Sequence, residues 1–405
     1  MIYRQSASCR LPRRLALVFF SCCLAMPSAE SFAAPASHAS STSIPVNSVP
    51  EPTHLAVVVH GLHGRPADLT YLGNAIGSRG QGRILPHLAH CNLHKTMDGV
   101  VKGGERLAAE IKEVVAAHPS LRAISFIGNS LGGVYSRYAL SLLWEPRTRT
   151  VLGLKPITFM SIATPHLGVR RFTVVPLPDL VHVATPLFIG QTGNDLILRS
   201  RGEGETPLLL EMAQSTKFLE PLAAFRHRCA YGNVKEDLLV PIGTALFHPG
   251  PESMEGTGHI LKETVVLPDG AREDVRMEVF AMPPAPWEDG LKEVEGSVQG
   301  ASPVMKERAD GRGRLASVPA VAGGAVPDDS NRDWMEPRMA AQLNALGWEK
   351  VAVAFRTPFF SAHNMICALS RDPLTTFLFR KGQGVMDHAA ARIARGAAEE
   401  DDGYA

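Results

Sequence analysis

The sequence predicts an α/β fold with a mostly parallel central sheet and helices on both of its faces. The first observation is the run 54–59, where three consecutive valines end a buried-type apolar stretch typical of a strand covered on both faces. The second is the alternation of strand-like and helix-like segments, with short connections, up to residue 164. The third is the length of 405 residues, which accommodates one large α/β domain with insertions.

Each element of this first part follows from a local pattern. The best helix candidate spans 103–118, because Leu107, Ile111 and Val114 fall on one helical face and Pro119 ends the segment. The elements expected in this part lie, in chain order, at 54–59 (strand), 66–76 (helix), 83–91 (strand), 103–118 (helix), 121–127 (strand), 131–143 (helix) and 156–162 (strand).

The alternation stops at residue 165. The segment 165–225 contains apolar stretches, several interrupted by prolines, without a strand period, and we expect a cap-like insertion of short helices and loops. Strand-like segments resume at 226–234, and the pair 262–267 and 274–281 flanks a Pro-Asp-Gly sequence that predicts a hairpin.

A long segment without periodicity precedes the C-terminal elements. Residues 283–331 are rich in Pro, Gly, Ala and charge, and we expect a disordered loop there. A helix at 334–346, a strand at 350–355 and a helix at 384–398 follow. The predicted organisation is a leader at 1–50, the first half of the core at 51–164, a cap or lid at 165–225, the core with a hairpin at 226–282, the loop at 283–331 and the rest of the core at 332–398.

The N-terminal segment has the features of a targeting sequence. Basic residues precede the apolar run Leu15–Met26, no acidic residue occurs before Glu30, and small residues follow. We expect a cleavable signal peptide that directs the chain to the secretory pathway or the exterior. The Ser-, Ala- and Pro-rich composition of 31–50 also fits a plastid transit region, and a retained anchor is a third interpretation.

Composition excludes several classes of function. The 41 Lys and Arg nearly balance the 40 Asp and Glu, so there is no basic excess for binding nucleic acid. No apolar stretch reaches the 18 residues of a spanning helix. Beyond the leader only Cys91, Cys229 and Cys367 remain, and we expect buried free thiols. No residues stand at metal-ligand spacing, so neither a metal nor a cofactor is expected.

The strongest chemical signal is the stretch Gly128–Gly133, whose sequence is Gly-Asn-Ser-Leu-Gly-Gly. It lies between a strand pattern and a helix pattern, which is where the nucleophile turn of an α/β-hydrolase must lie. Gly128 and Gly132 relieve the crowding around Ser130, and the following helix directs its amide groups and dipole at the hydroxyl. We therefore expect Ser130 to be a nucleophile. The alternative is a tight turn that only lets helix and strand pack.

A second glycine-rich turn follows the first strand. The sequence His60-Gly-Leu-His-Gly64 stands where α/β-hydrolases carry the second N–H group of the oxyanion hole. The expected donors are the N–H groups of Leu62 and Leu131. The alternative is a structural turn fixed by the ring of His60.

Three ordered motifs together resemble a known family. They are the His60–Gly64 turn, the Gly128–Gly133 turn and the stretch Ile162-Ala-Thr-Pro-His-Leu-Gly168, with further similarity around 192–196, 207–210 and 231–241. This pattern is similar to the putative serine esterase family, lipase-like α/β-hydrolases of plants, fungi and other eukaryotes. The resemblance implies the α/β-hydrolase fold, a Ser-Asp-His triad and hydrolysis of esters, often of lipids.

The resemblance places the triad acid at Asp237, in the order serine, acid, histidine. Glu236 is the near alternative, and Asp195 and Asp179 are more distant ones. The remaining interpretation is that Asp237 only forms a turn.

The triad histidine must follow the last strand. His363 does so, and Ala362-His363-Asn364 is similar to the final motif of the family. His388 is the alternative, but it lies within a helical pattern and we expect it at the surface.

These residues predict a serine hydrolase of carboxylic esters, with acylglycerol-like lipids as substrates and peripheral membrane contact. The alternatives are an acyltransferase, in which another alcohol replaces water, and a non-catalytic protein of this fold that binds a lipid or a protein.

Overall fold

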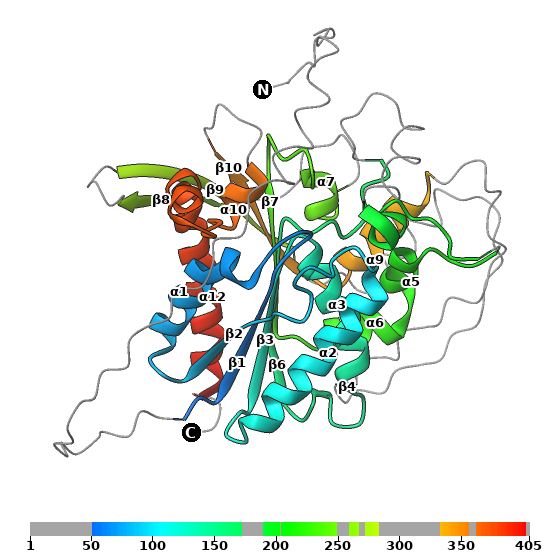
Figure 1. Ribbon diagram of the computed structural model, residues 1–405, viewed down its shortest axis with the longest axis horizontal. Coiled ribbons are helices and arrows are strands. Elements are labelled where there is room, and N and C mark those ends of the chain that lie inside the picture. Colours follow the sequence, from blue (N-terminus) through cyan, green and yellow to red (C-terminus); the bar gives the residue numbers. More distant parts are fainter. Residues whose placement is uncertain are drawn as a thin grey trace, which may run out of the picture. The chain divides into compact units, whose positions relative to one another are not determined.

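The central feature of the computed structural model is an eight-stranded sheet in the order β2-β1-β3-β6-β7-β10-β9-β8 (Figure 1). The structure describes residues 51–171, 189–202, 204–248, 259–266, 272–282, 333–355 and 362–401, all within the unit Pro50–Ala405. The strands are β1 (His54–Val59), β2 (Ile84–Leu88), β3 (Ala123–Asn129), β6 (Lys155–Ile162), β7 (His227–Asn233), β8 (His259–Val266), β9 (Arg272–Met282) and β10 (Trp348–Ala354).

The six strands from β2 to β10 are parallel, and β9 and β8 extend the sheet antiparallel beyond β10. All residues of β1 and β3 are buried, because helices cover both faces of the sheet. A short hairpin, β4 (Trp144–Glu145) and β5 (Thr150–Val151), lies outside this sheet.

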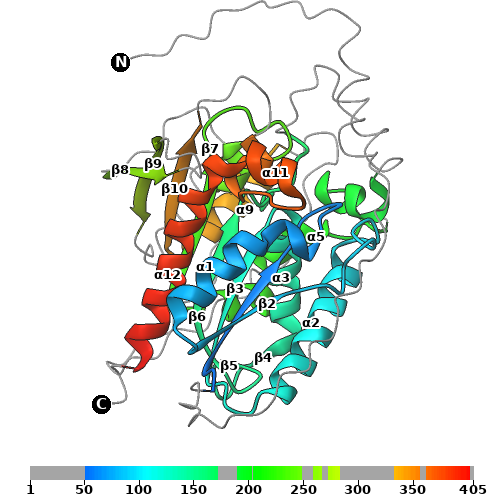
Figure 2. The same ribbon diagram turned by 60° about the vertical axis from the view of Figure 1, so that its left-hand side comes forward.

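Two layers of helices enclose the sheet. One apolar core joins one face to α2 (Val100–Ala117), α3 (Leu131–Leu143), α5 (Leu208–Gln214), α6 (Thr216–Ala223) and α9 (Met335–Asn344). A second core joins the other face to α1 (Thr70–Gly80) and α12 (Gln383–Asp401), as Figure 2 shows. The short elements are η2 (Pro66–Leu69), α7 (Ile242–Ala245), α10 (Ala362–Ile366), α11 (Pro373–Leu378) and η3 (Arg380–Gly382).

Two glycines explain why α2 packs closely on α3. A Cβ at Gly103 would lie 2.1 Å from the ring of Tyr135, and one at Gly104 would lie 2.5 Å from the ring of Tyr138. Both rings therefore occupy the space that side chains on α2 would fill.

The register brings the functional loops to one edge of the sheet. Val59 of β1 pairs with Gly128 of β3, and Asn233 of β7 pairs with Val353 of β10. Because these strands are parallel, the segments that follow them emerge on the same side. These segments contain all the residues expected to take part in catalysis.

The predicted fold class is confirmed: the protein has an α/β-hydrolase fold with a mostly parallel sheet. The positions of the elements agree closely with those expected from the sequence. Two helices differ at their ends: the one expected at 66–76 begins as a 3-10 turn and ends at Gly80, and the one expected at 103–118 begins at Val100. The hairpin pairs β8 with β9, although its turn at 268–270 lies outside the described residues. The leader expected at 1–50 and the loop expected at 283–331 also lie outside them.

In the segment 165–225, where a cap-like insertion of short helices and loops is expected, the structure has the short helices α5 and α6. Leu209, Met212, Phe218 and Leu222, on α5 and α6, are buried in the core beside α3 and α9. These apolar side chains therefore belong to the core, and the cap or lid role of 165–225 stays a prediction. Residues 172–188, which contain the other apolar stretches, lie outside the described part of the chain.

Two further features concern the free cysteines and the hydropathy of the helices. Cys229 and Cys367 are buried free thiols as predicted, whereas the free Cys91 is only half-buried. Among the described helices, none has the length and hydropathy that crossing a membrane requires.

Candidate active site

Ser130 occupies a sharp turn between β3 and α3. Its φ of 53° and ψ of −127° are strained for a residue with a Cβ. The glycines around it are sterically required: a Cβ at Gly128 would lie 2.3 Å from Cα of Gly133, and one at Gly132 would lie 2.2 Å from the carbonyl oxygen of Val59. This turn presents the hydroxyl of Ser130 above the edge of the sheet.

Three side chains from distant parts of the sequence form a continuous chain of polar contacts at this edge. The Oγ of Ser130 lies 3.0 Å from Nε2 of His363, and Nδ1 of His363 lies 3.0 Å from Oδ2 of Asp237. The distances fit a neutral imidazole that donates from Nδ1 to the carboxylate and accepts the serine proton at Nε2. Such an arrangement can activate the hydroxyl as a nucleophile.

The carboxylate of Asp237 is held by its own loop. Its Oδ1 accepts hydrogen bonds from the N–H groups of Leu239 and Val240, at 3.2 and 2.8 Å, and its Oδ2 accepts one at 2.7 Å from the Asn233 amide. Only 1% of the Asp237 side chain is exposed. Its orientation toward His363 is therefore fixed before any substrate arrives.

The His60–Gly64 turn passes directly beside Ser130. A Cβ at Gly61 would lie 2.7 Å from Cβ of Ser130, so only glycine permits this approach. The N–H groups of His63 and Gly64 already donate to Thr96 Oγ1 and to the Gly61 carbonyl, both at 3.0 Å. No acceptor for the N–H of Leu62 is found among the described residues, so this group remains available for an oxyanion.

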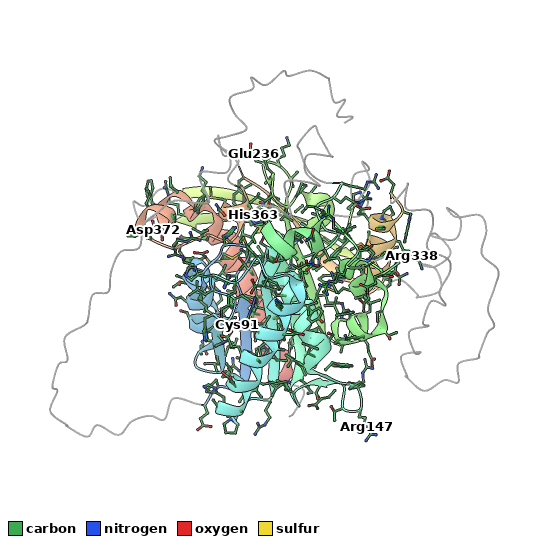
Figure 3. The ribbon with its side chains drawn as sticks, turned by 45° about the vertical axis from the view of Figure 1, so that its right-hand side comes forward. Cys91, Arg147, Glu236, Arg338, His363 and Asp372 are labelled. Carbon is green, nitrogen blue, oxygen red and sulfur yellow. The ribbon has the colours of Figure 1, made fainter. Side chains whose placement is uncertain are left out.

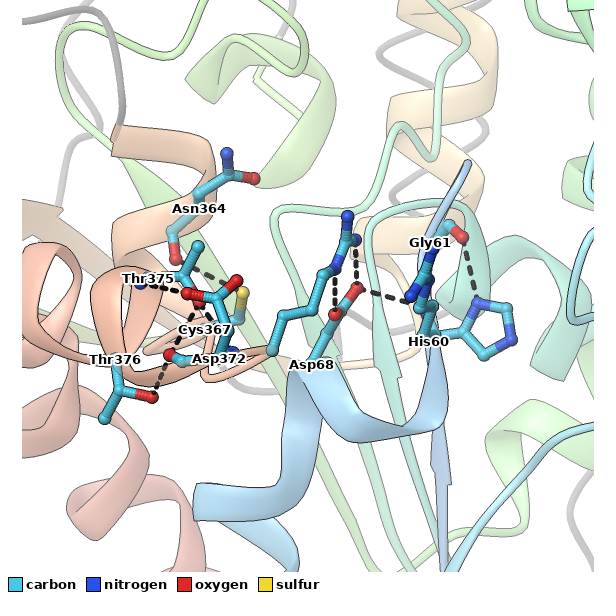
Figure 4. A network of polar contacts seen from close by, with 10 residues as sticks. His60, Gly61, Asp68, Asn364, Cys367, Asp372, Thr375 and Thr376 are labelled. Carbon is cyan, nitrogen blue, oxygen red and sulfur yellow. Dashed lines mark hydrogen bonds and ion pairs between the residues drawn. The ribbon is translucent and has the colours of Figure 1, made fainter. Parts of the chain in front are cut away.

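The second expected donor, Leu131, is the first residue of α3. The first N–H groups of a helix have no acceptor within the helix, and the positive end of its dipole lies there. On the other side of the site, His60 stabilises the His60–Gly64 turn, because its buried ring contacts the Gly61 carbonyl through Nδ1 at 3.0 Å (Figure 4).

A family model described as "Putative serine esterase (DUF676)" matches residues 49–250. The chain belongs to this family. The matched region includes Ser130, Asp237 and both glycine-rich turns, and it ends before His363.

Curated yeast proteins of Saccharomyces cerevisiae (strain ATCC 204508 / S288c) are similar to this esterase-family chain. It is 33% identical over 198 residues to "Putative lipase ROG1", covering 47% of the chain and 28% of that protein. It is 28% identical over 195 residues to "Putative lipase YDL109C", and this match covers 47% of the chain and 29% of that protein. The chain thus spans less than a third of the length of these relatives.

Solved structures give weaker similarities. Lipase BlEst2 of Bacillus licheniformis in propeptide form is 14% identical, with a TM-score of 0.32 and 57% of each chain covered. The RedJ thioesterase of Streptomyces coelicolor is 16% identical, with a TM-score of 0.26, 60% of this chain and 83% of that chain covered. The fold assignment rests on the strand order and the serine turn instead.

In this member of the serine esterase family, Asp237 and His363 each shift the pKa of the other. Burial alone would lower the pKa of His363, but the adjacent Asp237 carboxylate raises it above the usual 6.5. Burial would likewise raise the pKa of Asp237, but the charge of His363 and the hydrogen bonds to the carboxylate lower it. Asp237 is therefore ionised at neutral pH and stabilises a proton on His363.

The alternative acids and base lie elsewhere. Asp195 is buried against the start of α2, where its Oδ2 accepts a hydrogen bond at 2.8 Å from the N–H of Val100. Glu236 is half-buried, and Figure 3 shows it at the outer side of the molecule relative to His363. His388 is half-buried and contacts the Tyr231 hydroxyl, so its expected surface position is only partly correct. Asp179 lies outside the described residues.

Sequence reasoning missed two groups of residues. Asn233 orients the Asp237 carboxylate, and its place at the end of a strand, four residues before the acid, was a usable signal. No metal-ligand set is recognisable from spacing in the sequence, yet the fold brings His87, His90 and Glu110 together. Glu110 is 20 residues from His90 in the sequence, so spacing alone does not reveal that it joins the two histidines.

Proposed function

We propose that the chain is a serine hydrolase of carboxylic esters, with lipid esters of the acylglycerol type as its substrates. The observation that carries this proposal is the hydrogen-bonded chain from Ser130 through His363 to Asp237. Membership of the serine esterase family and similarity to yeast proteins named as lipases support it.

The proposed reaction uses the contacts among these three side chains. Ser130 Oγ attacks the acyl carbonyl carbon while Nε2 of His363 takes the hydroxyl proton, and Asp237 stabilises the imidazolium. The N–H groups of Leu62 and Leu131 stabilise the tetrahedral oxyanion, each contributing about 3–4 kcal/mol in comparable sites. His363 then gives its proton to the leaving alcohol. Water deprotonated by His363 attacks the acyl-enzyme, and the serine regains its proton as the acid leaves.

The distribution of exposed apolar side chains favours a lipid substrate. Seven large apolar residues are exposed in the described part of the chain, and five of them lie on the two segments that carry Asp237 and His363. They are Val234 and Leu239 in the loop after β7, and Leu374, Phe377 and Leu378 on α11. Apolar side chains concentrated in this way mark a surface that contacts another apolar phase.

Basic residues stand beside these apolar ones. The Arg380 guanidinium lies 4.0 Å from the centre of the Phe377 ring, and Lys381 follows it. An apolar helix face bordered by positive charge fits the boundary between acyl chains and anionic headgroups. We therefore propose that α11 contacts the lipid surface and brings the catalytic edge to its substrate.

This proposal is tested by comparing the hydrolysis of dissolved and of emulsified substrates. The variant Leu374→Ser/Phe377→Ser should bind vesicles containing anionic phospholipid less tightly and hydrolyse emulsified triacylglycerol more slowly. It should cleave a dissolved short-chain nitrophenyl ester at the wild-type rate, because neither residue takes part in the contacts among Ser130, His363 and Asp237. Leu142→Ser is the matched control, since Leu142 is 40% exposed at the end of α3 and should affect neither substrate.

Equal losses on both substrates would show that α11 supports the fold and not the lipid contact. Failure of the wild-type protein to cleave any ester, with Ser130 unreactive, would refute the hydrolase proposal itself.

A further inference from the structure

A second cluster of chemically versatile side chains lies at the outer strand of the sheet. His87 is on β2, His90 is two residues beyond its end, and Glu110 is on α2. One donor atom from each lies within 4.8 Å of the other two. Figure 3 labels Cys91, the residue that follows His90.

Glu110 is the fixed member of the cluster. Only 6% of its side chain is exposed, and its Oε2 accepts a hydrogen bond at 2.9 Å from the N–H of Cys91. Its Oε1 lies 2.8 Å from Nε2 of His87 and 2.6 Å from Nδ1 of His90. The His87 side chain is 20% exposed and that of His90 is 71% exposed, so the cluster opens to solvent on one side.

The contacts around Oε1 exceed what hydrogen bonding alone satisfies. Two imidazole nitrogens converge on this one oxygen, together with the N–H of His90, which lies 3.0 Å from Oε1 and is shared with Oε2 at 3.2 Å. A carboxylate oxygen offers about two lone-pair sites, so three donors compete for them. A cation placed between the three side chains would remove the competition, because each imidazole would then offer a lone pair.

We propose that His87, His90 and Glu110 bind a Zn²⁺ ion. Two imidazoles and one carboxylate form a donor set that zinc accepts, with a water molecule as the fourth ligand. Ca²⁺ and Mg²⁺ prefer sets made of oxygen atoms and fit these residues poorly. Zinc–ligand bonds of about 2.0–2.2 Å place the ligand atoms of a tetrahedral site about 3.4 Å apart. Each imidazole nitrogen must therefore move roughly 0.7 Å farther from Oε1 of Glu110. The exposed ring of His90 has room for this movement.

The bound ion fastens the loop after β2 to α2. This loop is already attached to α2 by a hydrogen bond from the Asn92 amide to the Gly103 carbonyl, at 3.0 Å. Farther along, Thr96 accepts the N–H of His63 in the turn that carries Leu62. The ion therefore stabilises the segment that supports this turn, and it takes no part in ester chemistry. The inference does not depend on the proposed hydrolase function.

The test uses the full chain freed of metals by a chelator and then dialysed. Titration with Zn²⁺ in a calorimeter should show one equivalent bound per chain, with a rise in the thermal midpoint as zinc is added. Co²⁺, used as a spectroscopic substitute, should give the visible absorption of a four-coordinate nitrogen and oxygen site. Because the His90 ring is mostly exposed, His90→Ala should fold normally and weaken binding by about tenfold or more.

The matched control is His94→Asn. His94 is an exposed histidine four residues from His90 with a φ of 60°, a conformation that asparagine tolerates, and its replacement should leave zinc binding unchanged. Wild-type affinity in folded His90→Ala, or an equal loss in His94→Asn, would overturn the assignment. Absence of zinc binding by the wild-type protein would do the same. Ser130→Ala should bind zinc like the wild type, which separates this test from that of the hydrolase.

Discussion

The Arg371 guanidinium donates two parallel hydrogen bonds to the Asp68 carboxylate, from Nε to Oδ1 and from Nη2 to Oδ2, both at 2.8 Å. Asp68 also accepts the N–H of Arg65 at 2.9 Å, at the end of the glycine-rich turn, and its carbonyl accepts the N–H of Ser370 at 3.3 Å. Figure 4 shows Asp68 between His60 on one side and the segment with Asn364 and Cys367 on the other. The pair thus joins the turn that carries Leu62 to the segment that carries His363.

Arg371→Lys should impair catalysis although the charge is retained. Lysine offers a point charge and cannot reproduce the two parallel bonds, so the turn and the His363 segment lose their fixed separation. We expect kcat to fall by about tenfold with little change in KM, because the ground-state contacts of the substrate remain. Ester kinetics with a dissolved substrate measure both constants.

The control for this variant is Arg79→Lys, which alters the 3.0 Å ion pair of Arg79 with Asp387 between α1 and α12. Both pairs are partly exposed, and Arg79 is remote from Ser130, so its replacement should leave kcat unchanged. A similar fall of kcat in the two variants would mean that Asp68 and Arg371 affect only general stability.

Asp237→Asn should change both the rate and its pH dependence. We expect kcat to fall by about 10⁴-fold, as in other triad enzymes that lose this charge. The kcat/KM of the wild type should rise with pH as His363 loses its proton, with a midpoint above the usual pKa of 6.5. Without the Asp237 carboxylate, burial is the remaining influence on the pKa of His363, and burial lowers this pKa. The midpoint of the profile should therefore move to lower pH.

The pH–rate profile of Asp237→Asn measures this shift, and Glu236→Gln provides the control because it changes the neighbouring carboxylate. An unchanged midpoint in Asp237→Asn, or a large shift in Glu236→Gln, would transfer the role of the triad acid to Glu236.

Gly132→Ala should destabilise the domain and abolish activity together. Its methyl group would lie 2.2 Å from the carbonyl oxygen of Val59, so β1 and α3 must separate at the nucleophile turn. We expect a loss of about 2 kcal/mol or more in the free energy of unfolding. Gly77→Ala is the control, because its methyl group on α1 would meet only Pro86, at 3.4 Å, and should be tolerated. Denaturant unfolding of both variants decides between these expectations.

The fold could be predicted because buried parallel strands leave a local signature. The runs that form β1, β3 and β6 are apolar on both faces, and each is recognisable without knowledge of its neighbours. Ser130 was recognisable for a similar reason, since its turn requires particular glycines at fixed spacing. By contrast, the apolar residues of α5 and α6 gave no indication of whether they cover the site or fill the core.

The remaining features depend on contacts between distant segments. Asp68 and Arg371 are 303 residues apart, and neither stands in a motif. His87 and His90 would point to opposite faces if β2 continued, so only the turn after Leu88 brings both to Glu110. The choice of Asp237 over Glu236 needed the family pattern, because a loop has no periodicity that separates neighbours.

The central claim is that Ser130 is a nucleophile activated by His363, and active-site labelling tests it most directly. A fluorophosphonate probe with mass-spectrometric mapping should give one adduct, on Ser130, with simultaneous loss of ester hydrolysis. His363→Ala should react far more slowly, and Ser130→Ala should neither react nor hydrolyse esters while retaining its fold. Ester hydrolysis at the wild-type rate by Ser130→Ala, or by wild-type protein that the probe leaves unlabelled, would contradict the account.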